Sequence, residues 1–211
     1  VWDYNKMSED PNLEGQYPIG KSELIFPKLL KGAGYINGMV GKWGLGPPNS
    51  TSIPTEMGFN YFYGYNCQRM AHNLYPPHLW ENDKRDFLDN KVVSPRLKLQ
   101  EGQDPYDESN YKVFNQNEYA PDKMHVTAQE FIENNYDNPF FLYYASPIPH
   151  APLQAPQYLV DKYRNIIGEE DPYLGDKGYF PTRYPRATYA AMIEYIDIQV
   201  GEIVDQLKRL N

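Results

Sequence analysis

The chain has 211 residues, of which 41% are hydrophobic and 15% aromatic. This content excludes a disordered chain and suffices for one sizeable domain or a large piece of a bigger one. The formal charge of −8 argues against a nucleic-acid-binding surface. No apolar stretch approaches the roughly 20 residues that cross a bilayer. The single cysteine, Cys67, excludes an internal disulfide and a cysteine-rich zinc site.

The first elements in chain order are a short helix and a strand. Ser22 is a candidate N-cap, Gly32 and the residues after it supply a stop, and Pro27 limits the helix to a couple of turns. Residues 35–40 have the pattern of a strand that runs into the glycine-rich loop of residues 41–46. This part therefore reads as helix, strand and loop.

The same unit recurs later in the chain. A helix is predicted over residues 124–136, with Val126, Phe131 and Ile132 on its apolar side. Residues 140–145, FFLYYA, form a continuous apolar run that is typical of a strand buried on both faces. Helix followed by strand, twice, predicts a parallel sheet in an α/β domain.

Two further segments complete the pattern. The polar run from Glu81 to Asp122 predicts long ordered loops. The clearest helix lies near the end of the sequence, where apolar residues recur at three- and four-residue spacing. They are Tyr189, Met192, Ile193, Ile196, Val200, Ile203, Val204 and Leu207. No strand follows this helix, so we expect an incomplete fold.

Two basic residues follow the two predicted strands. Lys42 lies in GKWGLG, where glycines let the backbone and the ammonium approach a ligand, although the spacing is not that of a phosphate-binding P-loop. The alternative is a solvated lysine beside a packed Trp43. His150 lies between prolines in a stiff loop, where a general acid or anion ligand and a structural role are both open.

The remaining polar candidates divide into two groups. Gln68, Arg69 and His72 lie in a polar and aromatic segment that also contains His78 and resembles a pocket wall, or else anchors a loop. His125 is predicted to be a surface or capping residue. The other group has no predicted catalytic role. The acidic run Glu169, Glu170 and Asp171 is assigned to an exposed loop without metal-ligand spacing, and Cys67 to a buried thiol.

Four blocks of sequence occur in a recognisable order. They are LLKGAGYINGMVGKWGLG, GFNYFYGYNCQRMAHNLYPPHLWEN, PFFLYYASPIPHAPLQAP and GDKGYFPTRYPRATYAAMIEYIDIQVGEIVDQLKRL. Together they resemble the sulfatase family of the alkaline phosphatase superfamily over nearly the whole chain. The first resembles the family's second signature, the third its later histidine block, and the fourth the long helix before its Asp-Asn-Gly metal segment. The resemblance implies an alkaline-phosphatase-like α/β fold with a mixed, largely parallel sheet flanked by helices.

The resemblance also implies roles for particular residues. Lys42 and His150 would contact the sulfate group, and His150 would help to protonate the leaving oxygen. The predicted substrate-binding residues are Gln68, Arg69, His72 and Trp43. Many members have histidine at the position of Gly44, whereas one branch carries GKWGLG. We hypothesise that His72 or Arg69 supplies the missing polar contact, so alanine at both positions should lower turnover of the full-length enzyme.

Several family features do not occur in this sequence. Sulfatases use a formylglycine made from Cys or Ser in a Cys/Ser-x-Pro/Ala-x-Arg motif, together with a calcium ion bound by acidic residues and an Asp-Asn pair. The segment CQRMA that begins at Cys67 does not fit that motif. We therefore expect residues 1–211 to be the central part of a sulfatase catalytic domain, inactive alone, with the calcium ligands outside this chain and no metal ligand within it.

The expected function is hydrolysis of sulfate esters on a sulfated carbohydrate or aryl sulfate, by a periplasmic or secreted enzyme. The expected partner is thus a small-molecule or glycan sulfate ester, with no nucleic acid and no membrane span. One alternative is a phosphoester or phosphonate hydrolase of the same superfamily, since Lys42 and His150 would serve a phosphoryl group nearly as well. The other is an inactive, sugar-binding relative. The sequence leaves the sugar and the oligomeric state open.

Overall fold

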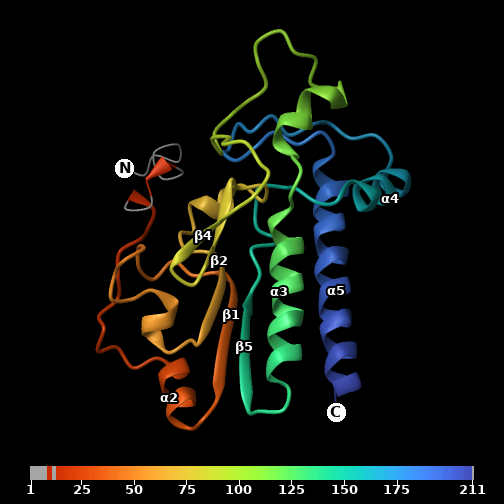
Figure 1. Cartoon of the computed structure of the whole chain (residues 1–211). Helices are drawn as coiled ribbons and strands as arrows, with labels where there is room; N and C mark the ends of the chain where they lie inside the picture. Colours follow the sequence, from red (N-terminus) through yellow and green to blue (C-terminus); the bar gives the residue numbers. More distant parts are fainter. Residues whose placement is uncertain (1–8, 11–12, 211) are drawn as a thin grey trace.

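A five-stranded mixed sheet forms the centre of the computed structural model, which describes residues 9–10 and 13–210 (Figure 1). The strand order is β4-β3-β2-β1-β5. β1 pairs in parallel with β2 and β5, whereas β2, β3 and β4 pair antiparallel. The strands are β1 (Ile36–Lys42), β2 (Tyr61–Tyr65), β3 (His78–Glu81), β4 (Lys84–Phe87) and β5 (Phe140–Ala145). The expected fold class, an α/β fold with a mixed sheet flanked by helices, is confirmed, with the parallel pairings at β1.

Helices cover the sheet on both faces. The α-helices are α2 (Phe26–Gly32), α3 (Ala120–Asn135), α4 (Gln157–Ile167) and α5 (Pro185–Leu210), and short 3-10 helices are η2 (Pro54–Met57), η3 (Met70–His72) and η4 (Glu108–Phe114). α3 packs on one face, where the ring of Phe131 stacks on Tyr61 at 6.3 Å and leaves room only for glycine at position 38. α2 packs on the other face, with Phe26 against Phe141 at 5.3 Å. α5 runs beside α3 (Figure 1).

Polar side chains join α3 to α5. The Gln199 amide donates to the carbonyl of Pro121 at 3.1 Å, and the Gln206 amide donates to that of Gln129 at 2.9 Å. His125 lies in the same seam, where its Nε2 is 2.7 Å from the Glu202 carboxylate. His125 is only 7% exposed, so the prediction of a surface or capping residue is wrong. It is buried because α5, which is far away in sequence, covers it.

The long helix exists as predicted, but its apolar residues do not all face the core. The buried positions of α5 include small and polar side chains, such as Ala187, Ala191 and Gln199. Four of the predicted apolar residues are between 41% and 53% exposed: Tyr189, Ile193, Val200 and Val204. Val126 of α3 is likewise 51% exposed, against the prediction that it lies on the buried side. Periodicity identified these helices but not the face that packs.

Two strand and helix predictions need smaller corrections. α2 begins at Phe26 with Ile25 at the N-cap and no side-chain cap, so Ser22 does not cap it. β1 extends to Lys42, two residues past the predicted end, because residues 41 and 42 pair with residues 64 and 65. β5 has the predicted bounds but is only partly buried, with Tyr143 44% exposed, because it is the edge strand of the described sheet.

The acidic run before α5 is also not simply an exposed loop. Glu170 is 8% exposed, and its carboxylate accepts hydrogen bonds from the backbone N–H groups of Arg186 and Ala187 at 2.8 and 3.0 Å. These are donors of the first turn of α5, which have no partner within the helix. Glu170 therefore acts as a remote cap whose negative charge suits the helix N-terminus.

Candidate active site

Lys42 is the last residue of β1, and small residues next to it bring the strands close together. Gly41 has φ +119°, and a Cβ there would lie 2.0 Å from the carbonyl oxygen of Ala145 on β5. Only glycine fits this backbone and this spacing. β1 and β5 are neighbouring parallel strands, so Lys42 at the end of β1 and His150 in the loop after β5 lie at the same edge of the sheet, where α/β domains bind ligands. Burial lowers the pKa of the Lys42 ammonium.

The loop after β1 is fastened to the loop after β2. The N–H of Trp43 donates to the carbonyl of Tyr65 at 2.9 Å, and that of Gly44 donates to the carbonyl of Asn66 at 3.2 Å. The Trp43 indole is 7% exposed and donates to the carbonyl of Ser52 at 2.9 Å. Trp43 thus packs in the core, as the alternative interpretation of the GKW triplet held. Its nitrogen is already used, so it has no polar atom to offer a substrate.

His150 is exposed and held by its own loop. Its backbone N–H donates to the carbonyl of Pro147 at 3.2 Å, and its Nδ1 lies 2.5 Å from the carbonyl oxygen of Ala151. A carbonyl only accepts hydrogen bonds, so Nδ1 carries the hydrogen. Within the described residues Nε2 has no partner, and it is the nitrogen that can face a ligand. As an imidazolium, His150 would present an Nε2–H donor.

His72 lies against His150. The two imidazole rings stack with centroids 5.7 Å apart and an angle of 14° between their planes. Burial, together with the smaller effects of Arg69, His150 and Lys42, lowers the pKa of His72 to about 4. His72 is therefore neutral at pH 7. The stacked rings bring His72 and His150 together, and Arg69 and Lys42 lie near enough to His72 to influence its charge.

Two glutamine side chains occupy the space next to Gly44. Gly44 has φ +95°, and a Cβ would meet the Gln16 amide oxygen at 2.5 Å and the Gln68 Cγ at 2.8 Å. The same Gln16 oxygen accepts a hydrogen bond from the Gln68 backbone N–H at 2.9 Å. Gln68, a predicted substrate-binding residue, thus lies beside the loop of Lys42. Gln16 fills the same space and was not predicted.

Glu14 anchors the segment that carries Gln16. Its carboxylate is 1% exposed and lies 2.8 Å from His78 Nε2, 2.7 Å from Trp80 Nε1 and 3.1 Å from an Arg85 nitrogen. The paired cation and hydrogen bonds compensate the burial of this charge. His78 is accordingly a loop anchor, which is the interpretation preferred over a pocket wall.

Two polar side chains near the strand ends, those of Asn66 and Ser146, escaped sequence reasoning, whereas Arg69 was predicted. Asn66 Nδ2, Arg69 Nε and Ser146 Oγ are buried without a hydrogen-bond partner among the described residues. Asn66 and Ser146 directly follow β2 and β5. Unsatisfied buried polar groups are rare in folded proteins and call for an explanation. Their position one residue past a strand end is the signal that could have identified them.

No three His, Cys, Asp or Glu side chains lie together as a metal site in the part of the chain that the structure describes. The residues gathered at the strand ends are cationic or neutral and do not fit a hard cation such as calcium, which prefers several carboxylate and carbonyl oxygens. Cys67 is fully buried, and burial raises the pKa of its thiol to about 11, so it is not an activated nucleophile.

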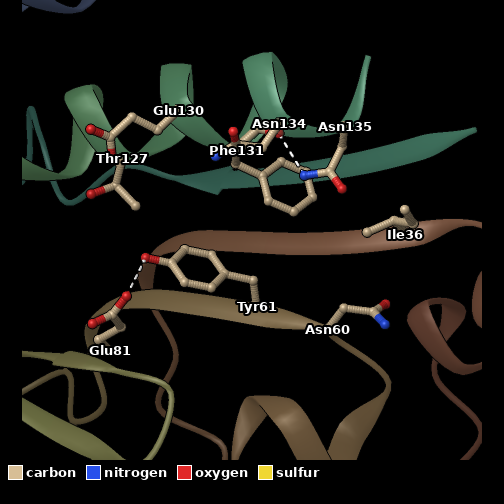
Figure 2. Close-up of a pocket in the computed structure, with 9 residues that line it drawn as sticks. All are labelled: Ile36, Asn60, Tyr61, Glu81, Thr127, Glu130, Phe131, Asn134 and Asn135. Atoms are coloured by element: carbon tan, nitrogen blue, oxygen red, sulfur yellow. Dashed lines mark hydrogen bonds between the residues drawn. The ribbon is translucent and has the colours of Figure 1, made fainter. Parts of the chain in front are cut away.

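The hollows beside α3 are separate from this site. One of about 400 Å³ lies between α3 and the strands, and Figure 2 shows the hydrogen bond of Tyr61 to Glu81 within it. Its lining includes Ile36, the first residue of β1, whereas Lys42 is the last. The strand between them is roughly 20 Å long at about 3.3 Å per residue. The hollow therefore marks the opposite end of the sheet.

The fold and the strand-end site define an α/β domain that gathers basic and imidazole side chains at one edge of its sheet. The chain belongs to the sulfatase family, because the model of the family described as Sulfatase matches residues 4–211. The alkaline-phosphatase-like fold expected from the sequence is that of this family.

Individual relatives agree with the family. The chain is 30% identical to Arylsulfatase J of Mus musculus over 87% of its own length and 26% of the relative's. It is 28% identical to the N-acetylgalactosamine-6-sulfatase of Homo sapiens, over 92% of this chain and 31% of that one. An uncharacterized sulfatase of Schizosaccharomyces pombe is 27% identical over 95% of this chain and 40% of its own length. The chain thus spans less than half of these relatives.

Solved structures show the same fold. The crystal structure of Ps i-CgsB has a TM-score of 0.63 at 23% identity, covering 95% of this chain and 41% of that one. The PsFucS1 sulfatase from Pseudoalteromonas sp. has a TM-score of 0.53 at 19% identity, over 92% and 38% of the two chains. Across the described residues, no helix of this chain is both long and apolar enough to span a membrane.

Proposed function

We propose that the protein to which this chain belongs hydrolyses sulfate esters of a sulfated carbohydrate or an aryl alcohol. The observation that carries the proposal is the juxtaposition of Lys42, Arg69, His72 and His150 at the ends of neighbouring strands in a member of the sulfatase family. Sugar and aryl esters are chosen because the relatives include an N-acetylgalactosamine-6-sulfatase and an arylsulfatase.

Lys42 acts on the sulfate group itself. Ester cleavage increases charge on the sulfate oxygens and on the leaving oxygen, and fixed positive groups in a dry site stabilise that charge. Lys42 is half-buried at the end of a strand whose position is fixed by Gly41. Its ammonium therefore needs to move little when the charge develops. A bound anion would also restore the ammonium form that burial disfavours.

His150 acts on the leaving group. As an imidazolium it donates the Nε2 proton to the ester oxygen while the sulfur–oxygen bond breaks, so that an alcohol leaves instead of an alkoxide. The hydrogen bond from Nδ1 to the Ala151 carbonyl orients the ring and keeps the Nδ1 hydrogen in place, so that Nε2 is the nitrogen that gives up its proton. Gln68, Arg69 and His72 line the site as substrate-binding residues.

The family resemblance supplies four further expectations. The nucleophile is a formylglycine and the metal a calcium ion, both supplied by parts of the protein outside these residues. Residues 1–211 are the central part of a sulfatase catalytic domain, which the partial coverage of the relatives supports. The complete enzyme is periplasmic or secreted. Residues of this chain perform binding and proton transfer only.

The test uses the full-length protein on paired sulfate and phosphate esters of the same alcohol. We expect the sulfate ester to be the better substrate. We also expect Lys42→Met to lower kcat/KM about 100-fold or more, because a preorganised charge is lost. His150→Asn should lower kcat about 100-fold for a sugar sulfate and less for an aryl sulfate, whose leaving group needs less protonation.

A lysine on the surface provides the control. Lys31, in the last turn of α2, is exposed, and Lys31→Met should leave both activities unchanged. Preference for the phosphate ester would favour a phosphoester hydrolase of the same superfamily. No turnover of either ester, with retained binding of a sulfated sugar, would favour a sugar-binding relative.

A further inference from the structure

Tyr179 lies in an unusual backbone conformation next to the site. Its φ is +64°, a left-handed value that a bulky side chain adopts only where the surroundings enforce it. Tyr179 belongs to the loop of residues 173–182, which we call the tyrosine loop. Strain of this kind is a reason to ask what the side chain does.

The tyrosine loop is closed and held from several sides. Tyr173 and Thr182 form an antiparallel bridge at its base, with N–H···O distances of 2.9 and 2.8 Å. Lys98, from a distant segment, donates its ammonium to the carbonyl oxygens of Gly175 and Tyr179, the latter at 3.2 Å. These contacts fix the backbone on which Tyr179 stands.

The residue after Tyr179 anchors the loop in the core. Phe180 is 1% exposed and packs on Phe114 with ring centroids 4.9 Å apart. The Thr182 hydroxyl donates to the carbonyl of Leu153, in the loop that carries His150, at 3.4 Å. The tyrosine loop and the His150 loop are therefore joined directly.

The Tyr179 ring packs against both histidines of the site. Its centroid lies 5.0 Å from that of His72 and 5.7 Å from that of His150, and both contacts are edge-to-face, at 66° and 80°. Tyr179 is partly exposed. Its hydroxyl has no hydrogen-bond partner among the described residues, although a partly buried phenol usually finds one. It is a spare donor beside the histidine that faces the leaving group.

We propose that Tyr179 is a specificity-determining residue that contacts the leaving group, with its ring against the substrate ring and its hydroxyl bonded to a sugar hydroxyl. The inference rests on the proposed sulfatase activity. It follows that Tyr179 should favour sugar sulfates over aryl sulfates, because only the sugar can use the hydroxyl.

Two variants of the full-length protein separate the ring from the hydroxyl. Tyr179→Leu keeps a Cβ and much of the volume but removes the ring. It should lower kcat/KM about 10-fold or more for a monosaccharide sulfate and for 4-nitrophenyl sulfate, mainly through KM. Tyr179→Phe should lower kcat/KM about 5-fold for the sugar ester and leave the aryl ester unchanged, since one hydrogen bond is lost.

Tyr158 of α4, which is 63% exposed, gives the matched control, and Tyr158→Leu should leave both esters unaffected. Equal values for wild type and both Tyr179 variants would overturn the proposal. So would a loss confined to kcat on both esters, because Tyr179 would then act only by holding His150. If the Leu variant does not fold, the Phe variant decides alone through its sugar-to-aryl ratio. Failure of the proposed function is seen separately, as a wild type that cleaves no sulfate ester.

Discussion

At the scale of single residues, His72 shows how charge is distributed in the site. Its ring is partly buried and lies near the basic side chains of Arg69, His150 and Lys42, so its own protonation is disfavoured. A neutral His72 can pack against an imidazolium at position 150 without adding a second charge. The site thus gathers the basic side chains of Lys42 and Arg69 and keeps His72 as a polar, uncharged contact.

The lowered pKa of His72 predicts a pH dependence of stability. Its pKa is about 4 in the folded protein and 6.5 as the ordinary value, so between these the unfolded chain binds a proton that the folded chain does not. The free energy of unfolding should therefore decrease as the pH falls from about 6.5 to 4. After allowance for solvent screening, we expect about 1 kcal/mol from this residue.

Urea unfolding of the full-length protein at pH 7 and pH 4.5 measures this effect, with His72→Asn as the comparison. The Asn variant cannot take up the proton, so its stability should fall less over the same interval. Identical losses in wild type and variant would show that His72 does not carry the shift.

At the scale of elements, a row of small residues crosses the three parallel strands. Gly64, Gly41 and Ala145 lie in register on β2, β1 and β5, and a Cβ at Gly64 would lie 2.1 Å from the Gly41 carbonyl oxygen. At this level, immediately before Lys42, the neighbouring strands leave no room for a side chain on either glycine. The geometry of the sheet edge at Lys42 therefore depends on having glycine at positions 41 and 64, because a larger residue would push the strands apart.

Gly41→Ala should accordingly destabilise the protein and displace Lys42. The new methyl group meets the Ala145 carbonyl and forces φ +119° on a residue with a side chain. We expect a loss of about 3 kcal/mol or more in the free energy of unfolding, with activity reduced in the fraction that folds.

Gly34→Ala is the matched control, because Gly34 has φ +89° but no atom within 4 Å of the position of a Cβ. The loss of stability in Gly34→Ala therefore measures only the cost of a left-handed backbone conformation in alanine, about 1 kcal/mol. Equal losses for the two variants would show that the contact with β5 is unimportant.

Sequence reasoning recovered the elements whose signals are local. The apolar run gave β5 its bounds from Phe140 to Ala145, and the helical periods located α3 and α5. Lys42 and His150 were found because each follows a strand. The burial of His125 and the role of Glu170 depend on α5, which is distant in sequence, and local patterns do not encode such contacts. Tyr179 reaches the site through a loop that is fixed by Lys98. Neither the spacing of residues nor the composition predicts this contact.

At the scale of the whole molecule, Gln154 joins parts that are far apart in the chain. Its side-chain oxygen accepts from the Leu74 backbone N–H at 2.7 Å, and its side-chain nitrogen donates to the carbonyl of Phe114. Its own carbonyl accepts from the Tyr119 hydroxyl at 2.8 Å. Gln154 is 1% exposed, so one residue at the end of the His150 loop connects that loop to the segment after η3, to η4 and to the start of α3.

Gln154→Leu should therefore destabilise all the segments that Gln154 connects, and not only the His150 loop. Leucine leaves the Leu74 N–H and the Phe114 carbonyl buried without partners, at a cost of about 2–5 kcal/mol in the free energy of unfolding. Gln157→Leu is the matched control, since Gln157 is exposed on α4 and bonds only Asp161 among the described residues, at 2.8 Å. It should change stability by about 0.5 kcal/mol or less.

Hydrogen exchange of the full-length protein distinguishes a junction from a local contact. If Gln154 connects the elements as the structure indicates, its loss should speed exchange at Leu74, in the first turn of α3 and in the His150 loop together. Faster exchange in the His150 loop alone would show that the other segments hold their positions without it. The site would then depend on the strand ends, and the loops around it would be fixed independently of one another.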